Sequence, residues 1–300
     1  MAQKYLKIIE KLSQGRVKLN EPLAKHTTFK IGGPADLFIE VTRETELIKL
    51  IKLIKKLKIP YFVLGGGSNI LVADEGFRGI VIKIANCEWR ISNFRIIAGA
   101  GVSLGELVKL AAKNSLAGLE FAAGIPGTVG GAVRGNAGAW QQAIGDRVTR
   151  VKVLTPAGRV KWLKAADCQF SYRQSRFKKT KEVILEVELK LEKGDKKEIE
   201  AKIKENLGKR ASQPKEPSAG CIFVNPKPAS AGELIEKCKL KGKKIGDAQV
   251  SPKHANFIVN LGKAKAQEVI KLIKLIKKKV KEKFGINLEE EICFLGFDKI

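Results

Sequence analysis

The sequence predicts an α+β protein in which a larger, glycine-rich half precedes a smaller mixed half. Two lysine-rich segments have apolar residues at helical spacing. The segments between them are mostly short β-branched runs bounded by Gly, Pro or Asn, which is typical of strands. A polar stretch over residues 192–216 contains a charged helical pattern, ends at two prolines and separates the halves. A chain of 300 residues and 32.9 kDa has room for two or three domains.

Two amphipathic helices are predicted, over residues 44–58 and 264–284. Both carry lysines opposite an apolar stripe that a neighbouring sheet can cover. The stripes consist of Leu47, Leu50, Ile51, Ile54 and Leu57 in the first helix, and of Val269, Leu272, Ile273, Ile276 and Val280 in the second. The central sequences of the two helices are nearly identical, but the flanking residues do not match. We therefore interpret the similarity as repeated use of lysine, isoleucine and leucine and not as a duplication. A membrane-surface helix would show the same pattern, but a stripe buried against a sheet is the better interpretation.

The remaining elements are mainly strands. Strands are predicted at residues 61–64, 79–84, 94–101, 148–154, 182–191, 255–262 and 287–297. A helix is predicted over residues 102–115, where Asn114 and then Gly118 mark the end of the pattern.

The net charge is strongly positive, because 57 Lys and Arg residues face 31 Asp and Glu residues, which gives +26. Such a field attracts polyanions, so nucleic acid is a rival partner and small phosphorylated ligands are another. Most of the excess is lysine on periodic helices, without arginine-rich or aromatic-interleaved clusters. This distribution favours a solvated surface over a nucleic-acid-binding face.

The cysteine pattern and the N-terminal segment bear on location. The chain has five cysteines and two histidines, with no Cys-x-x-Cys pair, which is poor material for a metal cluster and typical of a reducing compartment. The first residues interleave lysines with apolar residues and do not resemble a signal peptide. No run approaches the roughly 20 apolar residues that a membrane span needs. We therefore expect a cytoplasmic protein with no metal site and no membrane attachment.

A glycine triplet follows the strand predicted at residues 61–64. Gly65, Gly66 and Gly67 remove the Cβ atoms from one side of a turn and permit positive φ. Backbone N–H groups can then converge on a phosphate, and Ser68 and Asn69 can add side-chain donors. An ordinary tight turn is the alternative interpretation.

Two common phosphate-binding motifs are excluded. No Gly-Lys-[Ser/Thr] occurs, so the chain has no P-loop. The segment from Gly99 to Gly105 misses the G-x-G-x-x-G spacing by one residue, so the dinucleotide fingerprint fails as well. Any nucleotide bound here is held in another way.

A second glycine-rich segment spans residues 118–140 and contains seven glycines and one proline. It is too apolar for a flexible linker. The close passage of backbone against a large flat ligand is one use of such a segment, and tight packing of chain against chain is the other.

The sequence resembles the UDP-N-acetylenolpyruvoylglucosamine reductase (MurB) family from about His26 to Gly296. The motifs that carry the resemblance are HTTFKIGGPAD (26–36), LGGGSN (64–69), GLEFAAGIPGTVGGAVRGNAGA (118–139), SYRQSRF (171–177), PSAGCIFVNP (217–226), KIGDAQVSPKHANFIVN (244–260) and LEEEI (288–292). The spacing between Phe177 and Leu207 leaves no room for the family's extra tyrosine-bearing insertion, which places the chain in the shorter class.

The resemblance implies a PCMH-type FAD-binding fold (p-cresol methylhydroxylase-like) of two subdomains, residues 1–85 and 86–195. An α+β substrate-binding domain, residues 205–300, follows. The implied reaction is the NADPH-dependent, FAD-mediated reduction of UDP-N-acetylenolpyruvoylglucosamine to UDP-N-acetylmuramate in peptidoglycan synthesis. FAD is expected to bind non-covalently. The implied FAD-binding residues are Gly65, Gly66, Gly67, Ser68, Asn69, Gly124, Ile125, Pro126, Gly127, Thr128, Gly131, Asn136 and Ala137.

The resemblance also implies catalytic residues. Arg173 matches the arginine of the family's Tyr-Arg-x-Ser-x-Phe motif, and its forked donors suit a carboxylate whose charge grows towards an enolate. Glu291 matches the family's C-terminal catalytic glutamate. If this segment is a strand, alternate residues face opposite sides, so Glu289 is the fallback. A solvated glutamate run is the alternative interpretation.

The proton donor departs from the commonest family pattern. Where the family usually has serine after Ala-Gly, this chain has Cys221. An unperturbed thiol has a pKa of about 8.5, so a neutral cysteine is a competent acid. A small buried apolar cysteine is the alternative. Tyr172, Asn225 and Lys253 are implied as substrate contacts.

The implied partners are the UDP-sugar nucleotide and NADPH, and we expect a monomer that binds neither nucleic acid nor membrane. A flavin oxidase with covalent FAD is the rival enzyme, with His26 as the one histidine in the FAD-binding half that could carry the link.

Overall fold

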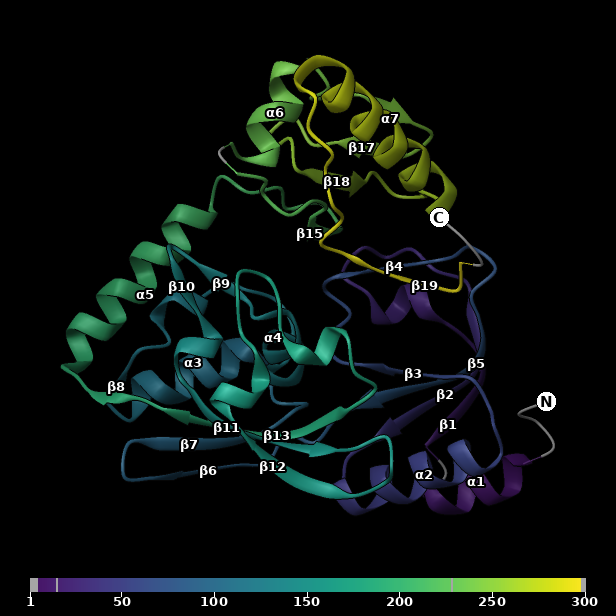
Figure 1. The fold of residues 1–300 in the computed structure, drawn as a ribbon, viewed down its shortest axis with the longest axis vertical. Helices are drawn as coiled ribbons and strands as arrows, with labels where there is room; N and C mark the ends of the chain where they lie inside the picture. Colours follow the sequence, from purple (N-terminus) through teal and green to yellow (C-terminus); the bar gives the residue numbers. More distant parts are fainter. Residues whose placement is uncertain (1–4, 15, 228, 298–300) are drawn as a thin grey trace. The chain divides into compact units, whose positions relative to one another are not determined.

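The computed structural model describes residues 5–14, 16–227 and 229–297. The chain forms two compact units. Unit 1 contains residues 1–18, 38–66 and 79–211, and unit 2 contains residues 19–37, 67–78 and 212–300. Figure 1 shows the course of the chain.

A four-stranded sheet forms early in the chain, with the strand order β1-β2-β5-β3. Its strands are β1 (Val17–Pro22), β2 (Pro34–Val41), β3 (Tyr61–Leu64) and β5 (Phe77–Ile84). Strands β3 and β5 run parallel. Two helices, α1 (Leu6–Leu12) and α2 (Glu44–Lys56), contact each other. Helix α2 buries four of its five predicted stripe residues, and Leu57 follows as its C-cap, so this predicted helix is confirmed.

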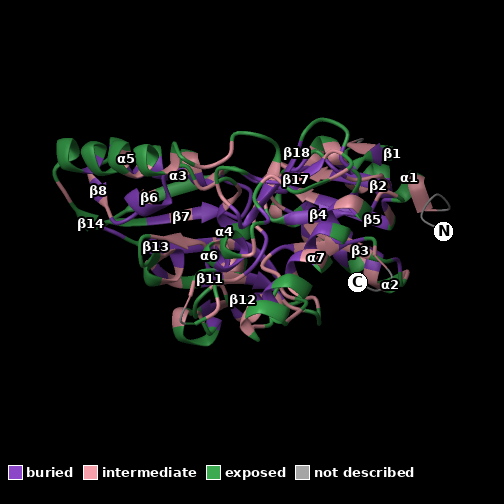
Figure 2. Ribbon diagram, turned by 90° about the horizontal axis from the view of Figure 1, so that it is seen from above, coloured by how far each residue is buried: buried purple, intermediate pink, exposed green. Residues whose placement is uncertain are grey.

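The second sheet of unit 1 has the order β12-β11-β13-β7-β6, with antiparallel neighbours throughout. The strands are β6 (Trp89–Ser92), β7 (Arg95–Gly99), β11 (Val148–Leu154), β12 (Val160–Lys164) and β13 (Val183–Lys190). Helix α4 (Val129–Gly135) contacts β13 and β7. Helix α3 (Leu104–Lys113) contacts α5 (Lys196–Arg210), which buries only Ile199 and is exposed along most of its length (Figure 2).

Several shorter elements lie between these helices and strands in the sequence. Two-residue strands pair β8 (Leu116–Ala117) with β14 (Glu192–Lys193), and β9 (Gly138–Ala139) with β10 (Gln142–Ala143). Short 3-10 helices lie at Leu23–His26, Glu120–Ala122, Ile144–Asp146, Ala165–Cys168 and Arg176–Lys178.

Unit 2 is built on a four-stranded antiparallel sheet of order β15-β18-β17-β16. Its strands are β15 (Ser218–Cys221), β16 (Lys244–Ile245), β17 (Ala248–Val250) and β18 (Phe257–Asn260). Helix α7 (Ala266–Phe284) contacts β16, β17 and α6 (Ala231–Lys237). The α7 stripe is buried as predicted. A separate parallel pair joins β4 (Ile70–Val72) to β19 (Cys293–Leu295).

Two sequence expectations need correction. The strand predicted over residues 287–297 is wrong in its first half, because only Cys293–Leu295 form a strand and Glu290 makes an isolated bridge to Phe223. The reason is that this segment changes partner, from Phe223 to β4, and does not continue one ladder. Helix α4 was not predicted, since glycine is a poor helix former. Thr128 caps it by accepting a hydrogen bond from Gly131 N–H. None of the described helices is long and apolar enough to cross a membrane.

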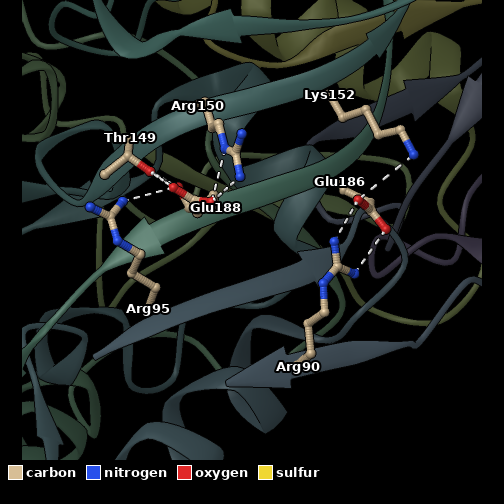
Figure 3. Close-up of polar contacts among 7 residues, drawn as sticks. All are labelled: Arg90, Arg95, Thr149, Arg150, Lys152, Glu186 and Glu188. Carbon is tan, nitrogen blue, oxygen red and sulfur yellow. Dashed lines mark hydrogen bonds and ion pairs between the residues drawn. The ribbon is translucent and has the colours of Figure 1, made fainter. Parts of the chain in front are cut away.

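Two glutamates of β13, Glu186 and Glu188, form ion pairs and hydrogen bonds across the second sheet (Figure 3). Both contact cationic side chains from other strands of the same sheet. The hydrogen-bond and ion-pair partners are Thr149, Arg150 and Arg95 for Glu188, and Arg90 and Lys152 for Glu186. Glu188 is 5% exposed, so it is the member that depends most on its partners.

We expect Glu188→Gln to lower the free energy of unfolding by about 1–3 kcal/mol at neutral pH. Burial alone would raise the pKa of the Glu188 carboxyl, but hydrogen bonds from Thr149, Arg150 and Arg95 together hold it below its ordinary value. A carboxyl whose pKa is lower in the folded state stabilises the fold above its unfolded-state pKa, and this contribution is lost as the pH falls through the folded value. The loss in the variant should therefore shrink in acid. Urea titrations across pH measure this.

The control for this prediction is Glu192→Gln. Glu192 pairs with Arg147, but its side chain is 73% exposed, and exposed pairs contribute little. An equal loss of stability in both variants, or a loss independent of pH, would contradict the role given to Glu188.

Candidate functional site

Unit 2 contains a cavity of about 490 Å³, called here the unit 2 cavity. Its wall comes from the end of β15, the helix α6 region and the loop before β18. The lining residues are Cys221, Asn225, Ser230, Gly232, Glu233, Glu236, Lys237, Lys241, Lys253, His254, Ala255 and Asn256. Three residues that the sequence analysis singled out, Cys221, Asn225 and Lys253, thus share one cavity.

Cys221 and Glu291 are brought together by a backbone ladder. Cys221 ends β15 and lies opposite Phe257 of β18. The next residue, Ile222, accepts a hydrogen bond of 2.8 Å from Glu291 N–H, and Val224 N–H donates to the carbonyl of Glu289 at 2.9 Å. The last predicted catalytic segment therefore lies directly beside the segment that carries the thiol.

The three consecutive glutamates have different surroundings. Glu289 is exposed, and Glu290 pairs with Lys277 of α7 at 2.7 Å. Glu291 is half-buried. Of the two candidates, Glu289 and Glu291, Glu291 has the more protected environment.

Asn69 supports Glu291 from the other side. Its amide Nδ2 donates to the Glu291 carbonyl at 3.2 Å, and its own carbonyl accepts from Cys293 N–H at 3.0 Å. Gly67 has a φ of +63°, and a Cβ there would collide with the His26 carbonyl, so this position requires glycine. Ser68, between them, is half-buried.

The charges of the unit 2 cavity are mostly compensated. Lys237 pairs with Glu233 at 2.8 Å, and Lys241 pairs with Glu236 at 2.7 Å. Lys253 is exposed, and among the described residues no carboxylate lies within ion-pair distance of its ammonium group. Lys253 is therefore the cation of this wall that is best able to meet an anionic ligand.

Two further residues of this wall, His254 and Asn256, were not singled out from the sequence. Asn256 N–H donates to Nδ1 of His254 at 3.2 Å, and burial lowers the pKa of His254 below its ordinary value. A signal was available for Asn256, because it is a polar residue within the apolar run ANFIVN.

In unit 1, Arg173 lies in a tight turn with a φ of +54°, a conformation that is rare for a side chain of this size. Its Nη1 donates to the carbonyl of Gly138 at 2.9 Å. The turn is held at both ends, since Asn136 Nδ2 donates to the Ser171 carbonyl at 2.8 Å and Ser175 Oγ donates to the Arg134 carbonyl at 2.7 Å. This arrangement fixes the guanidinium beside the C-terminal end of α4.

Neighbouring residues of this turn differ in exposure. Tyr172 is 58% exposed, with its ring 5.7 Å from the Arg173 guanidinium carbon. Asn136 is buried, and its Oδ1 also accepts from Gly145 N–H, so both ends of its amide bind protein main chain. Asn136 therefore positions the arginine turn, a role the sequence did not suggest.

The two glycine-rich segments of unit 1 lie against each other. A Cβ at Gly66 would lie 2.7 Å from the Cα of Gly127, and one at Gly65 would lie 2.6 Å from Oγ1 of Thr128. Tight packing of chain against chain therefore explains part of the glycine content. Gly66 is exposed, as is Gly131, so main chain without side chains also faces outward here.

Residues near the glycines Gly127 and Gly131 in the sequence are also partly accessible. Gly124 and Pro126 are exposed, and Ile125 and Ala137 are half-buried. This part of unit 1 offers a flat ligand a surface of exposed backbone with few side chains. Among the described residues, no three His, Cys, Asp or Glu side chains are grouped to hold a metal ion.

Known families match both parts of the chain. Residues 213–295 match the C-terminal domain of UDP-N-acetylenolpyruvoylglucosamine reductase, and residues 35–164 match an FAD binding domain. The chain is 43% identical over 293 residues to the UDP-N-acetylenolpyruvoylglucosamine reductase of Caldanaerobacter subterraneus subsp. tengcongensis, with 97% of each chain covered. It is 44% identical over 289 residues to the enzyme of Halalkalibacterium halodurans, with 95% of this chain and 96% of that one covered.

A solved structure agrees with these matches. The crystal structure of UDP-N-acetylenolpyruvylglucosamine reductase (MurB) from Thermus caldophilus matches with a TM-score of 0.81 at 38% identity, covering 93% of this chain and 99% of that one. The predicted fold class, a PCMH-type FAD-binding fold followed by a C-terminal α+β domain, is confirmed. The chain belongs to the UDP-N-acetylenolpyruvoylglucosamine reductase family of FAD-dependent oxidoreductases.

Proposed function

We propose that this chain reduces UDP-N-acetylenolpyruvoylglucosamine to UDP-N-acetylmuramate with NADPH and FAD, and that Cys221 supplies the proton. The observation that carries the residue assignment is the main-chain hydrogen bond that joins Glu291 to Ile222, the residue after Cys221, while Cys221 itself lines the unit 2 cavity. The bounds proposed for the domains are residues 1–85 and 86–195 for the FAD-binding part and residues 205–300 for the substrate-binding part. Family matches at residues 35–164 and 213–295 support them.

The residues of unit 1 fit FAD. The backbone of Gly66, Gly124 and Gly131 is exposed, which suits the close approach of a flat ring system. At Gly131 the missing side chain leaves this space open, because a Cβ there would meet only Oγ1 of Thr128. Backbone N–H groups of the two glycine segments would bind its phosphates. Bound FAD would supply the hydride chemistry of the reaction, and the protein supplies position and charge.

The protein groups have two tasks once the vinyl carbon has been reduced. Negative charge develops on the substrate carboxylate, and the forked donors of Arg173 suit its two oxygens. The neighbouring carbon then needs one proton, which Cys221 transfers from Sγ as general acid, leaving a thiolate that is reprotonated from solvent. We propose that Glu291, held by its own N–H and carbonyl, orients the groups around this proton.

The anionic part of the substrate would bind nearby. Lys253 offers a cation without a carboxylate partner among the described residues, which suits a diphosphate. Asn225 accepts from Ala231 N–H through Oδ1 and, like Lys253, lines the unit 2 cavity, which supports it as a substrate contact. Tyr172 is proposed as a further substrate contact, and its ring is 58% exposed.

We propose further that the protein acts as a cytoplasmic monomer, without a nucleic-acid or membrane partner. The lysines of α2 and α7 support this, since they lie opposite apolar stripes buried within the protein.

An anaerobic half-reaction tests the proposed function. The flavin-loaded protein is reduced with NADPH, and UDP-N-acetylenolpyruvoylglucosamine is then added while the visible absorbance of the flavin is followed. We expect reoxidation with formation of UDP-N-acetylmuramate. A flavin that stays reduced after addition of the sugar nucleotide would overturn the proposal.

We expect Arg173→Lys to lower kcat about 10- to 100-fold with a smaller change in KM. Lysine keeps the positive charge but loses the planar fork that meets both carboxylate oxygens and the hydrogen bond to Gly138. Steady-state kinetics measure the effect. Arg90→Lys is the matched control, because Arg90 pairs with Glu186 on the sheet and should leave the kinetics unchanged. Equal kinetics for both variants would contradict the role of Arg173.

A further inference from the structure

Asn256 is a buried polar residue on the wall of the unit 2 cavity, and its hydrogen-bonding groups all face protein main chain or His254. It is 2% exposed. Its Oδ1 accepts from Phe223 N–H at 3.0 Å, and its Nδ2 donates to the Phe223 carbonyl at 2.8 Å. Its own carbonyl accepts from Ile222 N–H at 2.8 Å. The side-chain amide thus satisfies both main-chain polar groups of Phe223, as the backbone of a neighbouring strand would do.

These bonds act on the segment that follows Cys221. Asn256 binds this segment on one side, and residues 289–291 bind it on the other, through Ile222 and Val224. Cys221 is therefore followed by a short backbone segment, residues 222–224, whose polar groups are hydrogen-bonded on both sides. A displacement of Phe223 would move both the thiol and the main chain of Glu291.

Asn256 also determines the state of His254. Its N–H donates to Nδ1 of the ring, so the neutral imidazole carries its proton on Nε2. His254 and Cys221 both line the unit 2 cavity. The bond to His254 comes from the main chain, so only the bonds to Phe223 depend on the asparagine side chain.

We propose that Asn256 is a positioning residue for the reaction: its side-chain amide holds the Cys221 segment in its working place. This inference rests on the proposed function for the role of Cys221. It does not depend on FAD, since all the bonds that carry it lie within unit 2.

The chain offers a matched control in Asn260, at the end of the same strand region. Asn260 is also 2% exposed, and its amide also binds main chain on both ends. Nδ2 donates to the Phe29 carbonyl at 3.1 Å, and Oδ1 accepts from Gly262 and Ala264 N–H at 2.8 and 3.0 Å. It does not line the unit 2 cavity.

The experiment compares Asn256→Ser with Asn260→Ser in the flavin-loaded protein. Both should lose thermal stability, because both break buried bonds. Only Asn256→Ser should lower kcat, by about 10- to 100-fold with KM within about 3-fold, as expected when a reacting group is misplaced. Only Asn256→Ser should also raise the rate at which iodoacetamide alkylates Cys221, by about 3- to 10-fold, because the segment opens locally. Mass spectrometry of the Cys221 peptide measures that rate.

A second variant covers the case in which Asn256→Ser does not fold. Asn256→Asp keeps the side-chain shape and the acceptor for Phe223 N–H but loses the donor to the Phe223 carbonyl, and it should change kcat and alkylation in the same directions. The inference is overturned if the Asn256 and Asn260 variants lose stability alike while Cys221 alkylation and kcat stay at wild-type values in both. It is also overturned if both positions change them equally. The alkylation rate needs no turnover, so this result is independent of whether Cys221 proves to be the acid.

Discussion

Replacement of Cys221 by alanine is expected to lower kcat about 10²- to 10⁴-fold, the usual contribution of a general acid. Alanine removes the proton but leaves the small volume at the end of β15 almost unchanged. The fold should survive, because Cys221 is half-buried and its segment is held by main-chain bonds to Glu291 and Asn256. Stopped-flow reoxidation of the reduced flavin by substrate isolates the affected step.

The serine variant separates proton donation from packing. Cys221→Ser should keep substantial activity, because a hydroxyl can still donate. In the wild type the neutral thiol is the active form, so turnover should fall as the pH rises through the thiol pKa, whose ordinary value is about 8.5. A serine hydroxyl does not ionise in this range. The alkaline limb of kcat against pH should therefore disappear in Cys221→Ser.

Cys238→Ala provides the control for thiol loss elsewhere in unit 2. Burial raises the pKa of the Cys238 thiol, and its Sγ faces the Lys279 carbonyl, not the unit 2 cavity. This variant should keep both the activity and the alkaline limb. An active Cys221→Ala enzyme, or an alkaline limb that persists in Cys221→Ser, would show that the proton comes from another group.

The elements that the sequence predicted well are those whose pattern is local. The apolar stripes of α2 and α7 repeat with helical spacing over three or more turns, so a window of the sequence contains the whole signal. The same holds for the strands β11 and β13, which are β-branched runs between turn residues. The family motifs added Cys221, Arg173 and Glu291 as positions, although periodicity alone gave them no role.

The features that the sequence did not predict depend on distant partners. Strand β19 begins only at Cys293, because its partner β4 lies more than 200 residues away in the sequence and pairs with Cys293–Leu295 alone. Asn69 reaches the Glu291 carbonyl over a separation of 222 residues, and Asn256 binds Phe223 over 33. Helix α4 was hidden by its glycines, which lower helix propensity and are tolerated only because the helix packs on β13 and β7. Packing of this kind overrides local preference.

A substitution at Gly131 tests whether the exposed backbone of α4 binds FAD. Gly131→Ala should leave the apoprotein folded, because its Cβ would meet only Oγ1 of Thr128 at an ordinary 3.5 Å. An added methyl group against a closely packed ring system costs about 1–3 kcal/mol. We therefore expect FAD affinity to fall about 10- to 100-fold. Titration of apoprotein with FAD, followed by flavin fluorescence, gives the dissociation constant.

Gly135→Ala is the matched control for Gly131→Ala, since it lies one turn further along the same helix and a Cβ there would meet nothing within 4 Å. Both substitutions place alanine in a helix, which should stabilise the apoprotein by up to about 1 kcal/mol. The two variants therefore share their effect on the fold and differ only in the surface they alter. If FAD binds Gly131→Ala with wild-type affinity, the cofactor does not lie against the start of α4, and the assignment of Gly131 and Thr128 to its site is wrong.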